Sequence, residues 1–135
     1  MIFVDSSAWL ALADVRDGNH KSALSFHREL LHGKSGRLLT SDYALDETLT
    51  LMRKRSGGEA TREFVGNLTD SLSLQQIWVT PAHYSAALEM FLGQGTRSWS
   101  FTDCTSFAIM RELGVREAFT FDGDFRQAGF QPRPT

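Results

Sequence analysis

The chain has 135 residues, of which 41% are hydrophobic and 22% are charged, and its formal net charge is −2. This length and composition exclude a fibrous or disordered protein and predict one domain spanning residues 1–135. The charge is unlike that of most dedicated nucleic-acid-binding proteins, so any RNA binding would depend on a local basic patch and on bound metal.

Short apolar runs alternate with helical patterns in the first half of the chain. Strands are predicted over residues 2–4 and 38–40. Helices are predicted up to residue 13, over 20–32, up to about residue 55, and over 59–73. The N-caps of the first and third helices are predicted to be serine or aspartate, namely Ser6 or Ser7 and Ser41 or Asp42. Glycines end the second and third helices, at Gly33 and at Gly57 and Gly58.

The second half of the chain continues this alternation. Strands are predicted over residues 77–79 and 118–121, and a polar loop is predicted over 93–100. One helix begins at Thr80 and Pro81, with proline in its first position. Another helix, capped by Ser100 or Thr102, runs through residue 113 and has Gly114 past its end. The tail, 131–135, holds two of the three prolines and is predicted to be irregular.

Strands that alternate with helices predict an α/β fold, in which a parallel sheet is covered by helices on both faces. Ligand sites in such sheets form just beyond the carboxyl ends of the strands. Asp5 directly follows the first predicted strand, and Asp122 directly follows residues 118–121. Asp103 opens a helix, and Glu47 lies in the second turn of the helix after strand 38–40. The four carboxylates are therefore expected to meet at one rim of the sheet.

Helical geometry separates Glu47 from its acidic neighbour. When residues 43–55 are placed at 100° intervals, the apolar side chains form one arc along the helix. Glu47 falls at the edge of that arc, whereas Asp46 falls almost opposite its centre. We therefore expect Glu47 to reach the cleft at the rim and Asp46 to point into solvent.

A cluster of carboxylates must hold either protons or cations. Two carboxylates about 5 Å apart repel each other by roughly 3 kcal/mol at an effective dielectric constant of 20. Hard divalent ions such as Mg²⁺ prefer oxygen ligands, and near a phosphodiester they can activate water and stabilise the leaving oxygen. The sequence has no histidine and cysteine spacing typical of a zinc site. An all-oxygen site for Mg²⁺ or Mn²⁺ is therefore the better chemical match.

Four acidic blocks of the sequence resemble those of PIN domains. The blocks are residues 4–9 (VDSSAW), 46–48 (DET), 100–104 (SFTDC) and 121–125 (FDGDF). Their order and separations are similar to those of VapC toxins from bacterial toxin–antitoxin pairs. The resemblance extends from residue 2 to about residue 133.

The resemblance implies a three-layer α/β/α PIN-like fold and a metal-dependent endoribonuclease that uses Mg²⁺ or Mn²⁺. It implies catalytic and metal-binding roles for Asp5, Glu47, Asp103 and Asp122. It also implies a VapB-type antitoxin that occupies the groove, and a homodimer. Residues 100–107, 121–125 and 128–130 look closest to the toxins that cut the sarcin–ricin loop of large-subunit (23S) ribosomal RNA.

The fourth acidic block leaves a choice between two acids. Many relatives have a neutral residue at the position of Asp122 and an acid just before the following phenylalanine. Here both positions are acidic, so Asp124 could share or replace the role of Asp122, which we favour because it is nearer the strand. Ser6 and Thr102 match hydroxyl positions beside the family's metal ligands, and they are equally good helix caps.

Basic and aromatic residues near the acids are candidates for RNA contacts. Arg53, Lys54 and Arg55 form a basic cluster that could bind phosphate or simply offset the helix dipole. Arg97 and Trp99, in the loop before Asp103, could bind phosphate and stack on a base, although Trp99 could equally be packed at an edge.

Other functions fit the sequence less well. A phosphotransfer receiver domain needs paired acids after the first strand, and a haloacid-dehalogenase-type phosphatase needs an acid where Ser7 stands. The main alternative is a PIN-like protein that binds RNA or a partner without catalysis. From the N-terminal sequence we expect neither a signal peptide nor a membrane span, and the lone Cys104 fits the expectation of a cytoplasmic location.

Overall fold

The computed structural model describes residues 1–33, 36–71 and 73–135. Within these residues, five parallel strands form one sheet in the order β3-β2-β1-β4-β5. The strands are β1 (Ile2–Val4), β2 (Leu38–Ser41), β3 (Leu74–Ile77), β4 (Glu117–Phe119) and β5 (Gln131–Arg133). The helices are α1 (Ser6–Ala13), α2 (His20–His32), α3 (Asp42–Thr69), α4 (Pro81–Leu92), α5 (Phe101–Leu113) and α6 (Asp124–Gln127).

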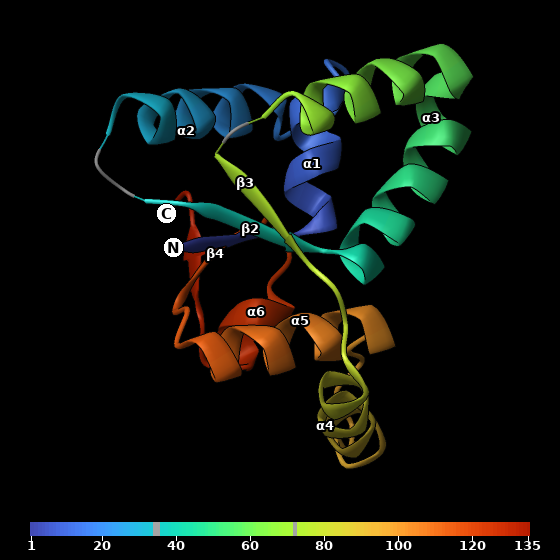
Figure 1. The fold of residues 1–135 in the computed structure, drawn as a ribbon, viewed down its shortest axis with the longest axis vertical. Helices are drawn as coiled ribbons and strands as arrows, with labels where there is room; N and C mark the ends of the chain where they lie inside the picture. Colours follow the sequence, from blue (N-terminus) through green and yellow to red (C-terminus); the bar gives the residue numbers. More distant parts are fainter. Residues whose placement is uncertain (34–35, 72) are drawn as a thin grey trace.

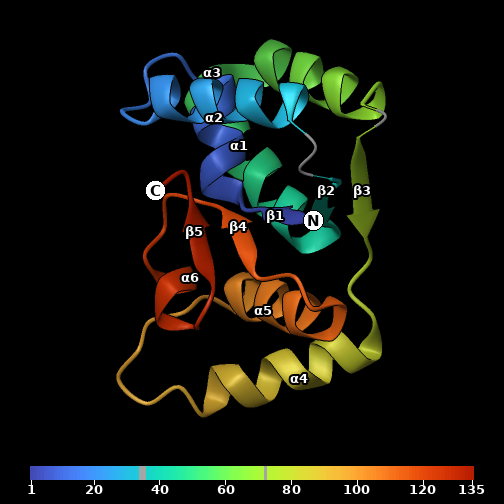
Figure 2. The same ribbon diagram turned by 90° about the vertical axis from the view of Figure 1, so that its left-hand side faces the viewer.

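Helices cover both faces of the sheet. Helices α1, α2 and α3 lie on one face, and α4, α5 and α6 lie on the other (Figures 1 and 2). Because side chains alternate along a strand, Val4 packs in the core under α1 and α2, whereas Phe3 packs in the core against α5. The predicted three-layer α/β/α fold with a central parallel sheet is confirmed. No helix in the described ranges is both long and apolar enough to cross a membrane.

Strand β1 lies at the point where the order of connections reverses. The chain passes from β1 to β2 on one side of it and later returns to β4 on its other side. In open parallel sheets, the crevice at the carboxyl end of such a strand is where ligands bind. The residue in that position is Asp5.

Several predicted boundaries are confirmed. Helix α2 and strand β1 have the predicted limits, α4 begins after Thr80, and Gly114 ends α5 in the left-handed conformation at φ +67°. Ser41 and Ser100 are the N-caps of α3 and α5, so Asp42 and Thr102 are not. The cap predicted for α1 is wrong, because Asp5 itself takes that position and accepts a hydrogen bond from Ser7 N.

The glycine pair does not separate two helices as fully as predicted. Helix α3 continues past it to Thr69, but its backbone is non-helical at Gly57, where φ is +87°. The carbonyl of Arg55, just before this kink, accepts a hydrogen bond from Arg16 Nη2 at 2.8 Å. The helix predicted over residues 59–73 ends earlier than expected, at Thr69, and residue 72 lies outside the described residues.

The strand predictions failed at the sheet edges. Edge strand β3 is Leu74–Ile77 instead of 77–79, because its solvent-facing glutamines give it little apolar signal. Strand β4 ends at Phe119, so Asp122 lies three residues beyond it. The tail predicted as irregular contains β5, whose proline is tolerated because an edge strand has one side unpaired. The short helix α6 was not predicted.

Candidate active site

Asp5 is fixed at the carboxyl end of the central strand. Its backbone N–H donates to the carbonyl of Phe119 at 3.0 Å, which continues the pairing of β1 with β4. Its side chain is buried, with only 2% of the residue exposed. Oδ2 accepts hydrogen bonds from Ser7 Oγ at 2.8 Å and from Thr120 Oγ1 at 3.0 Å. The carboxylate is therefore held beside α1 and the end of β4.

Asp103 is held in the first turn of α5 by a capping box. Ser100 Oγ accepts from Asp103 N at 2.9 Å, and Asp103 Oδ2 accepts from Ser100 N at 3.2 Å. Asp103 is buried, and its other oxygen has no partner among these capping bonds. The cap thus fixes the carboxylate without using both of its oxygens.

Asp122 and Asp124 join Asp103 in one carboxylate group. One oxygen from each of these three residues lies within 4.8 Å of the others. Asp122 Oδ1 also accepts a hydrogen bond from Asp124 N at 2.9 Å, at the start of α6. Both acids of the fourth acidic block therefore lie beside Asp103. That Asp122, and not Asp124, is the fourth metal ligand stays a prediction.

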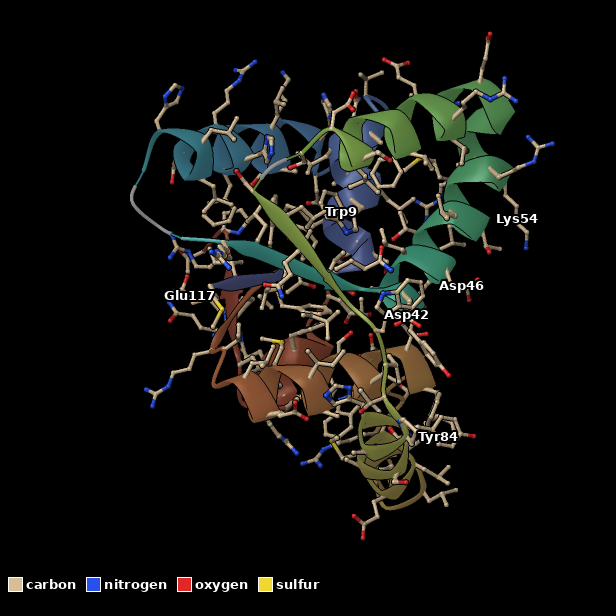
Figure 3. All side chains as sticks on the ribbon, in the orientation of Figure 1. Trp9, Asp42, Asp46, Lys54, Tyr84 and Glu117 are labelled. Carbon is tan, nitrogen blue, oxygen red and sulfur yellow. The ribbon has the colours of Figure 1, made fainter. Side chains whose placement is uncertain are left out.

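Glu47 lies beside the start of α1, as expected from the helical wheel. It is half-buried, and its Oε1 accepts a hydrogen bond from Ser6 Oγ. Its neighbour Asp46 is exposed, and Figure 3 shows Asp46 on the outward side of α3. Glu47 is not one of the three acids in the 4.8 Å group. Its contact with Ser6 places it next to Asp5 in the sequence, at the start of α1.

Burial and mutual repulsion raise the pKa values of these acids. Burial raises the pKa of Asp5 to about 6, and the nearby charge of Asp122 adds to the effect. The pKa of Asp103 rises to about 7, first through burial and then through the charges of Asp5 and Asp122. Burial, followed by the Asp122 charge, also raises the pKa of Asp124. The carboxylates are therefore close enough to compete for protons.

The carboxylate group fits a hard divalent cation. The ion pairs found among the described residues involve Asp14, Asp17, Glu112 and Glu117, so no protein cation neutralises the buried acids. Ionised carboxylates that are buried without a partner are costly, and a bound cation removes that cost. All of the candidate ligands are oxygens, which Mg²⁺ and Mn²⁺ prefer.

The structure corrects one of the predicted RNA contacts. Trp99 is buried and packs edge-on against Phe107, with ring centroids 5.3 Å apart, so its ring is part of the core. Of the two possibilities for Trp99, packing against the protein is confirmed and stacking on a base is wrong. Arg97 is exposed, and its guanidinium carbon lies 4.8 Å from the centre of the Trp99 ring.

The basic cluster on α3 is open to solvent. Arg53, Lys54 and Arg55 are all exposed, and Figure 3 shows Lys54 pointing away from the molecule. Arg55 also lies 3.8 Å from a carboxylate oxygen of Asp17, which offsets part of its charge. The cluster occupies the turns of α3 between Glu47 and the kink, so its role in binding RNA remains a prediction.

Two hydroxyl residues of the site were missed in the sequence. Ser7 was considered as a helix cap and not as a residue of the site, and Thr120 was placed inside a predicted strand. Both hydroxyls instead bond to Asp5. The pattern of a hydroxyl two residues after the first acid and another two residues before Asp122 was the available signal. Their contact spans 113 residues of sequence, so spacing alone did not reveal it.

Comparison with known proteins identifies close relatives. The family model described as the PIN domain matches residues 2–131. The 23S rRNA-specific endonuclease VapC20 of Mycobacterium tuberculosis is 38% identical over 130 residues, covering 96% of this chain and 95% of that protein. The VapC ribonuclease of Archaeoglobus fulgidus is 25% identical over 123 residues, covering 90% of this chain and 77% of that protein.

Solved structures of similar proteins have the same fold as this chain. The crystal structure of VapC20, described as a sarcin–ricin loop cleaving toxin, matches with a TM-score of 0.86 at 36% identity over 96% of each chain. A structure of VapBC2 from Rickettsia felis, bound to a DNA fragment from the promoter, matches with a TM-score of 0.71 over 98% of each chain. At 14% identity, this second match supports the fold alone.

Proposed function

The chain belongs to the PIN domain family, and from this we propose that it is a metal-dependent endoribonuclease and the toxin of a toxin–antitoxin pair. The observation that carries the proposal is the group of carboxylates at the end of β1. Asp103, Asp122 and Asp124 converge within 4.8 Å, and Asp5 lies close enough to raise the pKa of Asp103. The similarity to VapC20 extends over nearly the whole chain, so the acids occur in the context of a related nuclease.

We assign the substrate as 23S ribosomal RNA, cut in the sarcin–ricin loop. VapC20 is named for that rRNA and described as cleaving that loop, and it shares 38% identity with this chain. The final acidic block and the start of α5 carry the sequence resemblance to that subgroup. A cytoplasmic location follows from this substrate.

In the proposed reaction, the acidic residues form the metal-binding site. Asp5, Glu47, Asp103 and Asp122, with Asp124 beside them, would hold Mg²⁺ or Mn²⁺. When bound there, the ion supplies activation of water and charge neutralisation at the cleaved phosphodiester. Glu47 accepts from Ser6 through Oε1, and this contact would hold its carboxylate beside Asp5. The capping box of α5 keeps Asp103 from rotating away from the group.

The proposal is tested by incubating the purified protein with intact ribosomes. We expect one discrete 23S rRNA fragment in the presence of Mg²⁺ or Mn²⁺, and none in EDTA. Asp5→Asn and Asp103→Asn should abolish cleavage while the circular dichroism spectrum stays the same. Cleavage of tRNA with intact rRNA would reject the substrate, whereas full cleavage in EDTA would reject the metal mechanism.

The same experiment distinguishes a nuclease from a protein that only binds RNA. A non-catalytic PIN-like protein would retain ribosomes or RNA in a binding assay and leave the RNA intact under every metal condition. The pairing of buried, unneutralised carboxylates favours the catalytic function, because a surface that only binds RNA gains nothing from concentrated negative charge.

We propose a VapB-type antitoxin and a second copy of the chain as partners. An apolar groove of about 470 Å³ between α1, α2 and the second half of α3 offers a surface for the antitoxin. Expression of the chain alone should arrest growth, and co-expression with a short neighbouring gene product should restore it. Light scattering of the purified protein tests the homodimer.

A further inference from the structure

The two oxygens of the Asp5 carboxylate have different surroundings. Oδ2 accepts from Ser7 Oγ at 2.8 Å and from Thr120 Oγ1 at 3.0 Å, with a longer contact of 3.4 Å from Ser7 N. Within the described parts of the chain, both side-chain donors to this carboxylate bond to Oδ2, and no side-chain hydrogen bond reaches Oδ1. One oxygen is thus occupied by the protein, and the other is left for a ligand.

Both hydroxyls are themselves fixed by backbone N–H groups. Phe121 N donates to Ser7 Oγ at 3.0 Å, and Asp122 N donates to Thr120 Oγ1 at 3.0 Å. A hydroxyl that accepts from an N–H still has one hydrogen to donate, and the charged oxygen of Asp5 is a stronger acceptor than the other hydroxyl 3.2 Å away. The direction of both bonds to Asp5 is therefore determined.

These bonds join two parts of the site that are distant in sequence. Ser7 belongs to the first turn of α1, and Thr120 follows β4 at the start of the segment that carries Asp122 and Asp124. Thr120 is 2% exposed, so its hydroxyl has no competition from bulk water. The Thr120 hydroxyl contacts both Asp5 and the backbone of Asp122, and therefore sets the distance between these two acids.

We propose that Ser7 and Thr120 are positioning residues of the metal site, which hold Asp5 with Oδ1 free and keep the segment 121–124 against it. This inference rests on the proposed function, since it concerns the same acidic group. Neither hydroxyl contacts the reacting atoms. Both act through Asp5 and through the backbone of the segment that follows β4. Hydrogen bonds of this kind to metal-binding carboxylates typically contribute ten- to a hundredfold to metal affinity.

The test compares variants that keep or remove the Thr120 hydroxyl. Thr120→Val retains the shape of the side chain without its hydroxyl, and Thr120→Ser retains the hydroxyl without the methyl group. We expect Thr120→Val to weaken Mn²⁺ binding about tenfold in isothermal titration calorimetry without RNA, and Thr120→Ser to bind within about twofold of wild type. In the cleavage assay, Thr120→Val should lower kcat and leave KM nearly unchanged.

Thr48→Val is the matched control. Thr48 is also fully buried, and its hydroxyl donates only to the carbonyl of Ala44 within α3 at 2.7 Å. The same chemical change there should leave the Mn²⁺ affinity unchanged. If Thr120→Val fails to fold, Ser7→Ala provides the measurement, because Ser7 is only half-buried and its truncation leaves the core intact.

The outcomes separate this inference from the proposed function. Wild-type Mn²⁺ affinity in folded Thr120→Val, or equal loss in Thr120→Ser, would overturn the positioning role and leave the nuclease standing. Conversely, a protein that binds Mn²⁺ with the expected variant pattern but cuts no RNA would retain the positioning role and reject the nuclease. A wild-type protein without Mn²⁺ affinity would overturn both.

Discussion

Asp46 and Glu47 are consecutive acids on α3 whose surroundings differ. Asp46 is exposed on the outward side of the helix (Figure 3), whereas Glu47 is half-buried and bonded to Ser6. Because residues one apart on a helix point about 100° from each other, only one of them can face the site. The pair therefore separates the effect of position from the effect of charge.

The first prediction uses this pair. Glu47→Gln removes the charge next to Ser6 and should lower kcat/KM for RNA cleavage by a hundredfold or more, as expected for the loss of a metal-binding or proton-accepting carboxylate. Asp46→Asn makes the same chemical change and should stay within about twofold of wild type. The measurement is the initial rate on a sarcin–ricin loop hairpin. Equal losses of activity in both variants would show that activity depends on the total charge of α3 and not on the direction in which each carboxylate points.

The second prediction concerns pH and stability in the metal-free protein. The pKa of Asp103 rises from 3.8 to about 7 through burial and through the charges of Asp5 and Asp122. The native state therefore binds more protons than the unfolded state between these values, so its stability should fall as the pH rises through this window. Asp103→Asn removes the effect and should raise the free energy of unfolding by about 2–4 kcal/mol at pH 8.

Urea unfolding in EDTA at pH 4 and pH 8 measures the effect of Asp103→Asn. The gain in stability should be present at pH 8 and small at pH 4, where the wild-type carboxyl is protonated in the native state and roughly half protonated in the unfolded state. Mn²⁺ should stabilise the wild-type protein at pH 8 more than it stabilises the variant. A gain of equal size at both pH values would attribute the effect to packing instead of charge.

At the scale of the elements, the backbone conformation of Gly57 determines the direction of the second half of α3. Its φ of +87° and ψ of 177° belong to a region that residues with a side chain rarely adopt. The kink directs the second half of α3 back over α1 (Figure 1). There, Phe64 packs edge-on against Trp9, with ring centroids 5.7 Å apart. One glycine thus allows a long helix to cover the sheet instead of extending into solvent.

The third prediction follows from this backbone conformation. Gly57→Ala should destabilise the protein by about 1–3 kcal/mol, because no atom within 4 Å blocks the added methyl group and the cost comes from φ alone. Gly66→Ala, in a regular turn of the same helix with equal space around it, should instead stabilise by about 0.5–1 kcal/mol. Urea denaturation compares the two. A neutral Gly57→Ala would show that the kink relaxes at little cost.

Element prediction from the sequence succeeded where burial produces a strong pattern. The central strand β1 is buried throughout, and α2 has a clear apolar face closed by Gly33, so both have the predicted limits. The edge strands β3 and β5 are stabilised by backbone pairing with β2 and β4, which side-chain patterns do not reveal. The expectation that Asp5 and Asp122 lie at one rim followed from the rule that strand ends in a parallel sheet share one edge, and the catalytic roles of the four acids stay a prediction.

Long-range contacts account for the part of the site that the sequence left open. The bond from Thr120 to Asp5 and the packing of Trp99 on Phe107 depend on how segments meet in three dimensions. A tryptophan in a loop can face solvent or the core, and nothing local to residues 93–100 decides between them. The helical wheel, in contrast, placed Glu47 correctly because the periodicity of one helix is a local property.

At the scale of the whole molecule, charge opposes the proposed substrate. The net charge of −2 and the acidic group at the rim both repel RNA. We therefore expect binding to depend on metal ions and on exposed basic residues such as Arg53, Lys54, Arg55 and Arg97. Glu117, at the start of β4, lies at the opposite end of the strands from Asp42, at the start of α3 (Figure 3). Basic residues at these two ends can therefore be compared.

The fourth prediction compares Arg97 with Arg116. Both are exposed, and either alanine variant changes the net charge equally, but Arg97 precedes the helix that carries Asp103, whereas Arg116 lies at the opposite end of the strands, just before β4. If Arg97 contacts one phosphate, Arg97→Ala should lower the salt slope of hairpin binding by a little under one unit. It should raise KM more than it lowers kcat, because this residue does not activate the water.

Arg116→Ala should retain both the salt slope and KM, which would show that the location of the charge matters and not its total. Cleavage of the hairpin at several salt concentrations gives all of these values. An unchanged salt slope with a much lower kcat in Arg97→Ala would mean that Arg97 stabilises the transition state, and would add it to the catalytic residues. Equal changes in both variants would mean that RNA responds only to net charge, and that the loop before α5 is not part of the binding surface.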